Sequence, residues 1–432
     1  MNRNEVSIPI EPENIAGDAN AKEVRQASVI FIVVTVLLDA LSFGLALPVM
    51  PNIVLAHVGR SFTAATWWLG MLAAAFAAAQ FAVSPLLGAL SDRFGRRPVI
   101  LLSNLGMGIN YVCLALAPYL WIFLIGRLIC GATAASLTAA NAYVADTHDE
   151  SSRVRAFGFI GGAMGLGIVL GPALGGLLGE YSPTLPFLVA AGLAIANFCY
   201  GLLILPESLP ESKRSRSVEW RKATPFGSVA FLLSLPGRIN LSLALLITEF
   251  SNCILVTVFL AYVEYRYRWT VATVGLVVTA TSIADIPVLL MTDRCVSVVG
   301  ERRTILIGMA SGCLSFLIMG VADRSTLFLC SIPFFALSCL AASPIQAELA
   351  ARVNADEQGR VQGAISSLRG LARVFAPYFF SQIFTLSIRP GLPVYFSGAA
   401  FISAGLIFMV GFALAERGTQ PSNGNASASR AI

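Results

Sequence analysis

Charged side chains are scarce in this chain. They make up only 12% of its 432 residues, whereas hydrophobic residues make up 56%. A soluble domain carries about 25% charged residues. This shortage of charge excludes a disordered chain, a coiled coil and an ordinary cytosolic enzyme. It predicts a helical protein that crosses a membrane many times.

Metal-binding and catalytic patterns are also missing. The chain has two histidines, and His57 and His148 both fall in predicted loops. None of the eight cysteines forms a CxxC pair or a metal-ligand spacing. The sequence contains no HExxH, GxSxG or GxxxxGK[ST] pattern. We therefore expect neither a membrane enzyme nor an ATP-driven pump, and no bound metal or cofactor.

Long apolar stretches are what the chain does have. A helix needs roughly 20 apolar residues to cross about 30 Å of hydrocarbon. Twelve stretches meet that length: 28–50, 66–90, 98–118, 120–144, 156–179, 184–205, 240–263, 272–292, 303–321, 326–349, 361–386 and 392–415. We expect an all-α membrane protein of twelve transmembrane helices. Its parts are polar tails at 1–26 and 416–432, six-helix bundles at 27–205 and 239–415, and a basic central loop at 206–238.

Positive residues gather in alternate loops. One set of loops holds many: Arg93, Arg96, Arg97, Arg153, Arg155, Lys213, Arg214, Arg216, Arg221, Lys222, Arg294, Arg302, Arg303, Arg352 and Arg360. The other set holds few. Because such loops stay on the cytoplasmic side, both tails and the central loop are expected in the cytoplasm, at the inner membrane. The net charge of +5 then reflects orientation, and no nucleic-acid partner is expected.

The two halves resemble each other. The stretch from Ser136 (SLTAANAYVADTHDESSRVRAFG) matches the stretch from Ser343 (SPIQAELAARVNADEQGRVQGAI) at several polar positions. The loop SDRFGRR from Ser91 also matches a longer loop from Thr292, in which Glu301 replaces an arginine. A parallel repeat of six spans is one way in which transporters build alternating access around a midplane site.

Several ionisable residues fall inside the predicted spans. They are three acids and three bases: Asp39, Glu249, Asp285, Arg127, Arg369 and Arg373. A charge at bilayer depth costs several kcal/mol unless it is paired or hydrated, so each one is a functional hypothesis. We assign Asp39, Arg127, Asp285 and Glu249 to proton coupling. The alternative for each is a structural ion pair or the wall of a wet cavity.

Other polar residues in the spans are candidates for a substrate cavity. Gln80, Asn110, Tyr111 and Arg373 are assigned to it. Intramembrane amides serve more often as hydrogen-bond links between helices, and that alternative stays open for Gln80 and Asn110.

Glycines mark two further segments. In the fifth span Gly167, Gly171 and Gly175 recur every four residues beside Pro172 and Gly176, which predicts a close helix contact or a gate. The loop after the second span contains a regular set of small and charged residues: Gly88, Asp92, Arg93, Gly95, Arg96 and Arg97. Asp92 among arginines indicates a salt bridge at a helix end.

These residues together resemble the major facilitator superfamily. The loop residues match its signature between spans 2 and 3, Arg127 and Gly131 its span 4, and the glycines with Pro172 the span 5 of its antiporters. LLDALSFGLALPVMP, LPESLP and YVEYRYRW resemble the tetracycline-efflux branch of the drug:proton antiporters. The chain departs from that branch at Asn110, where an acid is usual, at Asp285, where many have histidine, and at Gly312, where an acid is usual.

The resemblance implies a proton-coupled exporter of a hydrophobic or amphipathic small molecule, either a tetracycline-like drug or several different drugs, working as a monomer in the lipid bilayer. Asp39 would carry the proton, and Arg127 would favour its carboxylate when close. Asp92, Arg96 and Arg97 would form the inner gate. The alternative is a symporter or uniporter for a metabolite on the same fold. A further alternative is a non-transporting receptor.

Overall fold

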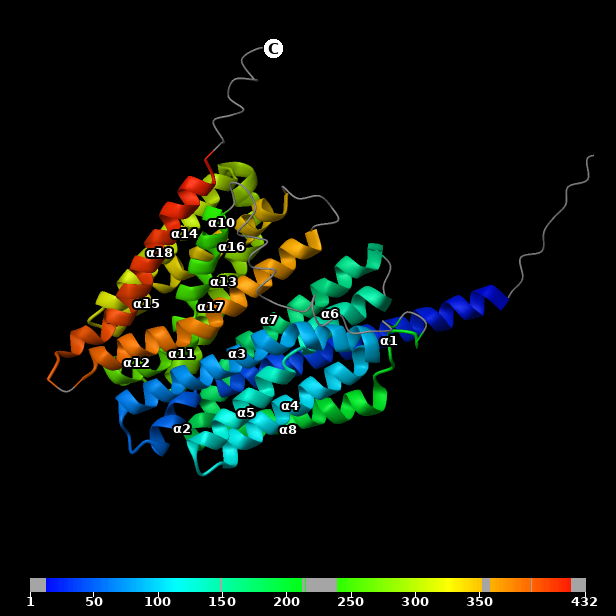
Figure 1. Cartoon of the computed structure of the whole chain (residues 1–432), viewed down its shortest axis with the longest axis horizontal. Coiled ribbons are helices and arrows are strands. Elements are labelled where there is room, and N and C mark those ends of the chain that lie inside the picture. The colour runs from blue at the N-terminus through cyan, green and yellow to red at the C-terminus, as the bar shows by residue number, and fades with distance from the viewer. Residues whose placement is uncertain are drawn as a thin grey trace, which may run out of the picture.

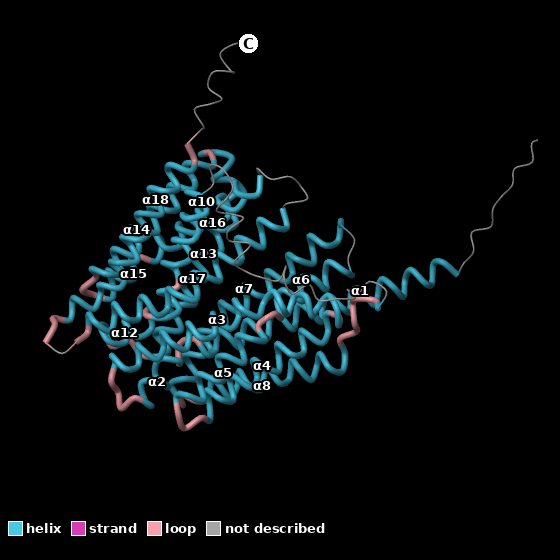
Figure 2. Tube along the Cα trace, in the orientation of Figure 1, coloured by secondary structure: helices cyan, strands magenta, loops and turns pink. Residues whose placement is uncertain are grey.

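The computed structural model describes residues 13–147, 150–211, 214, 239–351, 358–389 and 391–420. Over these residues the chain is helical between short loops and contains no strand (Figure 2). Most of the predicted central loop, 206–238, lies outside the described residues, as do residues 1–12 and 421–432. The first described helix begins at Glu13, within the predicted tail 1–26, and the last ends at Gly418, within the predicted tail 416–432.

The first half consists of eight helices: α1 Glu13–Ala46, α2 Met50–His57, α3 Phe62–Phe94, α4 Arg96–Leu116, α5 Leu120–Thr133, α6 Ser136–Thr147, α7 Glu150–Tyr181 and α8 Leu185–Ile204. The second half consists of α10 Ile239–Asn252, α11 Ile254–Thr257, α12 Phe259–Tyr267, α13 Val271–Val299, α14 Glu301–Val321, α15 Ser325–Leu329, α16 Ile332–Ala351, α17 Gln358–Ser387, the 3-10 helix η2 Val394–Gly398 and α18 Ala399–Gly418.

The helices account for the predicted spans. Among the described residues, ten helices or helix runs are long and apolar enough to cross a membrane, and the pair α1–α2, bent by 45°, makes an eleventh. The remaining predicted span, 361–386, corresponds to α17, which is less apolar and carries Arg369 and Arg373. It packs along α3. This arrangement is consistent with twelve spans.

The predicted repeat is visible in the packing. In the first half α4 packs against α5 and α8, and in the second half α14 packs against α16 and α18. The matching loops also share a backbone conformation. Gly95 has φ 108° and ψ 166° before α4, and Gly300 has φ 91° and ψ 151° before α14. Side chains rarely adopt this conformation, which explains glycine at both positions.

Two long helix pairs, α3 with α17 and α7 with α13, form the main contact between the halves. Along one, Gly70 of α3 faces Pro377 and Ser381 of α17. Along the other, Gly176 of α7 lies against Val271 and Gly275 of α13. Both contacts are near the end of the molecule where α2 and α12 lie, which we call the α2 end (Figure 1).

Toward the opposite end the halves separate. Gly158, Gly161, Gly162 and Gly165 of α7 are exposed and have nothing within 4 Å of the position a Cβ would take. Figure 1 shows the two groups of helices meeting near α2, α11 and α12 and diverging toward the start of α1. We call this the open end. The molecule is therefore closed at the α2 end and open at the other.

Candidate functional site

Asp39 lies where three helices of the first half meet. Its carboxylate accepts a hydrogen bond from Ser136 Oγ of α6 and one from Asn197 Nδ2 of α8, the latter at 3.0 Å. The same Asn197 nitrogen donates to the Thr35 carbonyl at 3.2 Å, and Asn197 is fully buried. Neutral donors, and no cation among the described residues, therefore hold this carboxylate.

Arg127 of α5 forms no ion pair among the described residues. Its Nη2 approaches the Met50 sulfur at 3.9 Å, its guanidinium carbon lies 5.9 Å from the centre of the Phe76 ring, and its Nε is buried without a partner. Tyr111 and Cys130 lie within electrostatic range of both Arg127 and Asp39. The pairing of Asp39 with Arg127 that the sequence suggested is therefore not formed in this conformation.

Glu249 is the membrane acid that does pair with a base. Its Oε1 accepts a hydrogen bond from Arg369 Nε at 2.8 Å, which joins α10 to α17. The side chains keep 19% and 30% of their exposure, respectively. This arrangement matches the alternative that the sequence left open for Glu249, a structural ion pair.

Asp285 lies on α13, further along the helix than Thr279, which contacts α7. The register set by Thr279, whose hydroxyl donates to the Val169 carbonyl, places Asp285 level with the exposed glycines of α7. One carboxylate oxygen is buried without a partner, and the other interacts with the Cys339 thiol of α16. Asp285 thus lies at the depth of the exposed glycines, with its carboxylate against α16 of its own half.

The four predicted cavity residues separate into two groups. Asn110 and Tyr111 are 1% and 3% exposed, and Asn110 packs against Gly126 of α5 inside the first half. Both polar atoms of the Asn110 amide lack a partner. Gln80 is partly exposed and Arg373 is exposed. In this conformation only Gln80 and Arg373 are accessible.

The loop between α3 and α4 forms the predicted salt-bridge network at the open end. Arg96 pairs with Asp92 at 2.5 Å and with Asp146 of α6 at 2.9 Å. Arg97 Nη2 donates to the Leu202 carbonyl at 2.7 Å. Arg93 instead stacks on Phe94. The network ties α3, α4, α6 and α8 together within one half.

Glu207 completes this loop. Its carboxylate accepts hydrogen bonds from the backbone N–H groups of Arg96 and Arg97 at 2.8 and 3.2 Å, and from those of Ser208 and Leu209. These bonds satisfy free donors at the start of α4, where the helix dipole favours negative charge.

Gly95→Ala is expected to reduce both folded protein and transport. The new Cβ would collide with the Glu207 carboxylate at a backbone angle that disfavours side chains. Gly88→Ala is the matched control, since nothing lies within 4 Å of its Cβ position. The yield of monodisperse purified protein and its Tm measure the effect. Equal values for the two variants would contradict this role of Gly95.

The glycines of α7 bring helices into backbone contact. Gly171 lies against Gly44 of α1, and Gly175 lies against the Leu45 carbonyl. On another face of α7, Pro172 and Gly176 lie against Gly275 of α13 in the second half. The predicted small-residue face is thus a packing stripe within the first half, and part of it continues onto the seam between the halves.

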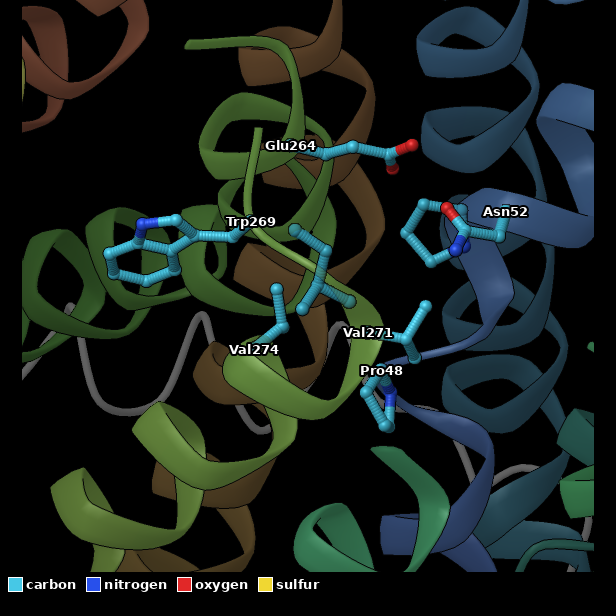
Figure 3. A pocket seen from close by; sticks show the side chains of 8 residues that line it. Pro48, Asn52, Glu264, Trp269, Val271 and Val274 are labelled. Atoms are coloured by element: carbon cyan, nitrogen blue, oxygen red, sulfur yellow. The ribbon is translucent and has the colours of Figure 1, made fainter. Parts of the chain in front are cut away.

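The α2 end is closed by contacts between the halves. The Asn52 amide, oriented to donate, lies 2.7 and 3.2 Å from the two Glu264 carboxylate oxygens, and the Phe62 ring packs edge-on against Tyr265. Figure 3 shows Asn52 and Glu264 across a small recess lined also by Pro48, Trp269 and Val271. Glu264 lies beyond the predicted span, and burial raises the pKa of its carboxyl, opposed by Arg268.

Four residues in these networks were not singled out from the sequence. Ser136 and Asn197 bind Asp39, Asp146 binds Arg96, and Glu207 caps α4. Asn197 and Ser136 are ordinary polar residues in apolar runs, and only their position around Asp39 gives them significance. Glu207 belongs to the LPESLP stretch, which served only as a resemblance.

Comparison with known proteins identifies the family. The profile described as Major Facilitator Superfamily matches residues 32–377 and 241–431. The class C tetracycline resistance protein of Escherichia coli is 32% identical over 392 residues, covering 90% of this chain and 97% of that protein. The class B protein of Escherichia coli is 32% identical, covering 83% and 88%. Multidrug resistance protein 2 of Bacillus subtilis is 27% identical, covering 91% and 96%.

Solved structures share the fold. The human organic anion transporter MFSD10 superposes with a TM-score of 0.67 at 23% identity, covering 90% of this chain and 99% of that one. The nucleoside transporter NupG superposes with a TM-score of 0.74 at 14% identity, covering 91% and 99%. At these identities the likeness concerns the fold alone.

Proposed function

Since the chain belongs to the major facilitator superfamily, we propose that it is a membrane transporter that exports an amphipathic drug, of the tetracycline type, in exchange for protons. The names of its relatives support the drug class, because tetracycline resistance proteins align over nearly the whole chain. The basic loops support an orientation in which the open end and both tails face the cytoplasm, with the protein in the inner membrane.

Asp39 carries the proposal of proton coupling. It is an acid in the middle of a span, bound by two neutral donors and unpaired with any base among the described residues. Such a carboxylate can take up and release a proton without breaking an ion pair. The Ser136 hydroxyl can donate to the carboxylate and accept from the protonated acid, so it serves both states.

The exchange then has two steps. In the conformation described, the substrate enters from the cytoplasm and Asp39 releases its proton. In the opposite conformation the α2 end opens, the substrate leaves and Asp39 binds a proton from outside. The site is thus exposed to the two sides of the membrane in turn. This alternation uses the proton gradient as its energy source and needs no bound cofactor and no second subunit.

The test is drug accumulation in inverted membrane vesicles. Respiration acidifies their interior, and an exporter of the proposed kind then concentrates added tetracycline inside. Collapse of the pH gradient with nigericin should release the drug. Tetracycline that accumulates without a gradient would contradict proton coupling. Failure to accumulate tetracycline, with accumulation of other amphipathic drugs, would contradict the tetracycline assignment alone.

A further inference from the structure

Arg373 lies level with the middle of the long helix α3. Gly70 of α3 faces Ser381 of α17, and Gly370 of α17 faces Phe81 of α3, which fixes one antiparallel register along the pair. In that register Arg373 is level with Ala78, the central residue of the 33-residue helix α3. Both Arg373 and Ala78 are exposed, so the helices leave space at this depth.

The rotation of α17 directs Arg373 inward. We measure angles around the axis of α17 from Arg369, which faces α10. The residues that face α3 (Gly370, Pro377 and Ser381) then fall at about 80–120°. Arg373 falls at about 40°, in the narrow sector between α10 and α3. The exposed apolar residues Phe375, Tyr378 and Leu386 fall at about 180–260°, in the wide sector that suits lipid. Arg373 therefore faces the space between the halves.

Arg373 has no acidic partner among the described residues. Among the described membrane residues, Glu249 is occupied by Arg369, Asp39 is bound by Ser136 and Asn197, and Asp285 interacts with Cys339. Arg373 lies within electrostatic range of Cys253, and no acid among the described residues pairs with it. An unpaired guanidinium at bilayer depth is costly, which makes it a candidate ligand for an anion.

We propose that Arg373 binds a negatively charged group of the exported molecule, so that the preferred substrates are amphipathic anions. A guanidinium binds a carboxylate or enolate through two parallel N–H bonds. The inference deepens the proposed function, on which it rests for the idea of a substrate.

Matched probes test the charge requirement. 1-Naphthaleneacetate and its methyl ester share one ring system and differ in charge. Isothermal titration calorimetry on the purified full chain in detergent should show about tenfold tighter binding of the acid than of the ester. Arg373→Gln should remove that difference, and Arg373→Lys should retain part of it. Binding of the neutral ester, unchanged in both variants, shows that the site is intact.

The matched control is Arg302→Gln, an exposed arginine at the open end, which should leave both affinities unchanged. Equal affinity of acid and ester for the wild type, or an absence of binding by both, overturns the proposal. So does a preference for the acid that survives in Arg373→Gln. Tetracycline accumulation is measured in parallel: if it is proton-linked while charge preference is absent, only this inference fails, and the converse result rejects only proton coupling.

Discussion

Asn197→Leu is expected to slow proton-linked drug accumulation by about tenfold or more at neutral pH. The leucine has a similar volume but removes the hydrogen bond from Nδ2 to Asp39 and the bond to the Thr35 carbonyl. A hydrogen bond to a charged group contributes about 1.5–3 kcal/mol, and each 1.4 kcal/mol changes an equilibrium tenfold. Because the ionised form loses a donor, proton release becomes harder and activity should recover toward higher pH.

Asn104→Leu is the matched control for this variant. Asn104 is also fully buried in the first half, and neither of its amide atoms has a partner. Its replacement removes no hydrogen bond, so the pH profile of accumulation should remain that of the wild type. A loss of rate in Asn197→Leu at every pH, without any shift of the profile, would assign Asn197 a structural role only.

Glu249→Gln is expected to destabilise the protein by about 3 kcal/mol. Removing one partner of a buried ion pair costs roughly 3–5 kcal/mol because it leaves the other charge uncompensated. We expect the lower end of this range because the Arg369 side chain keeps 30% of its exposure to solvent. The double variant Glu249→Gln/Arg369→Gln should recover most of the stability, since no lone charge remains.

Unfolding in detergent as a function of denaturant measures both variants. Recovery in the double variant indicates a structural pair between α10 and α17. A double variant as unstable as Glu249→Gln would contradict a structural role for the pair. Transport by the double variant tests a role in proton coupling separately, because this variant lacks the Glu249 carboxyl.

The sequence predicts the helices far better than the contacts among charges. Hydrophobic length and the loop arginines are sufficient for the spans, because both depend on local composition. The repeat between the halves follows from polar matches, and Gly95 and Gly300 confirm it in their backbone angles. Helix α1 begins before the predicted first span and α18 ends after the predicted last one, since polar sequence can extend a helix beyond an apolar stretch.

Partners across the bundle could not be predicted in the same way. Asp39 and Asn197 are 158 residues apart, and Glu249 and Arg369 are 120 apart. Their meeting depends on the rotation of each helix, which a span of uniform hydrophobicity leaves undetermined. The pairing of Asp92 with Arg96 was predicted because the two residues lie four positions apart at one helix end. Asp146 and Glu207 come from distant segments, so their contacts with Arg96 were not predicted.

The role of Asp39 is tested most directly by proton release from acidified inverted vesicles carrying a pH-sensitive dye. Adding tetracycline to vesicles with the wild-type protein should release protons from the interior, because each drug molecule enters in exchange. Asp39→Asn keeps the shape, and its amide can accept from Asn197 Nδ2 and donate to Ser136 Oγ, but it cannot titrate, so release should be absent. Proton release that persists at the wild-type rate in Asp39→Asn would contradict the account.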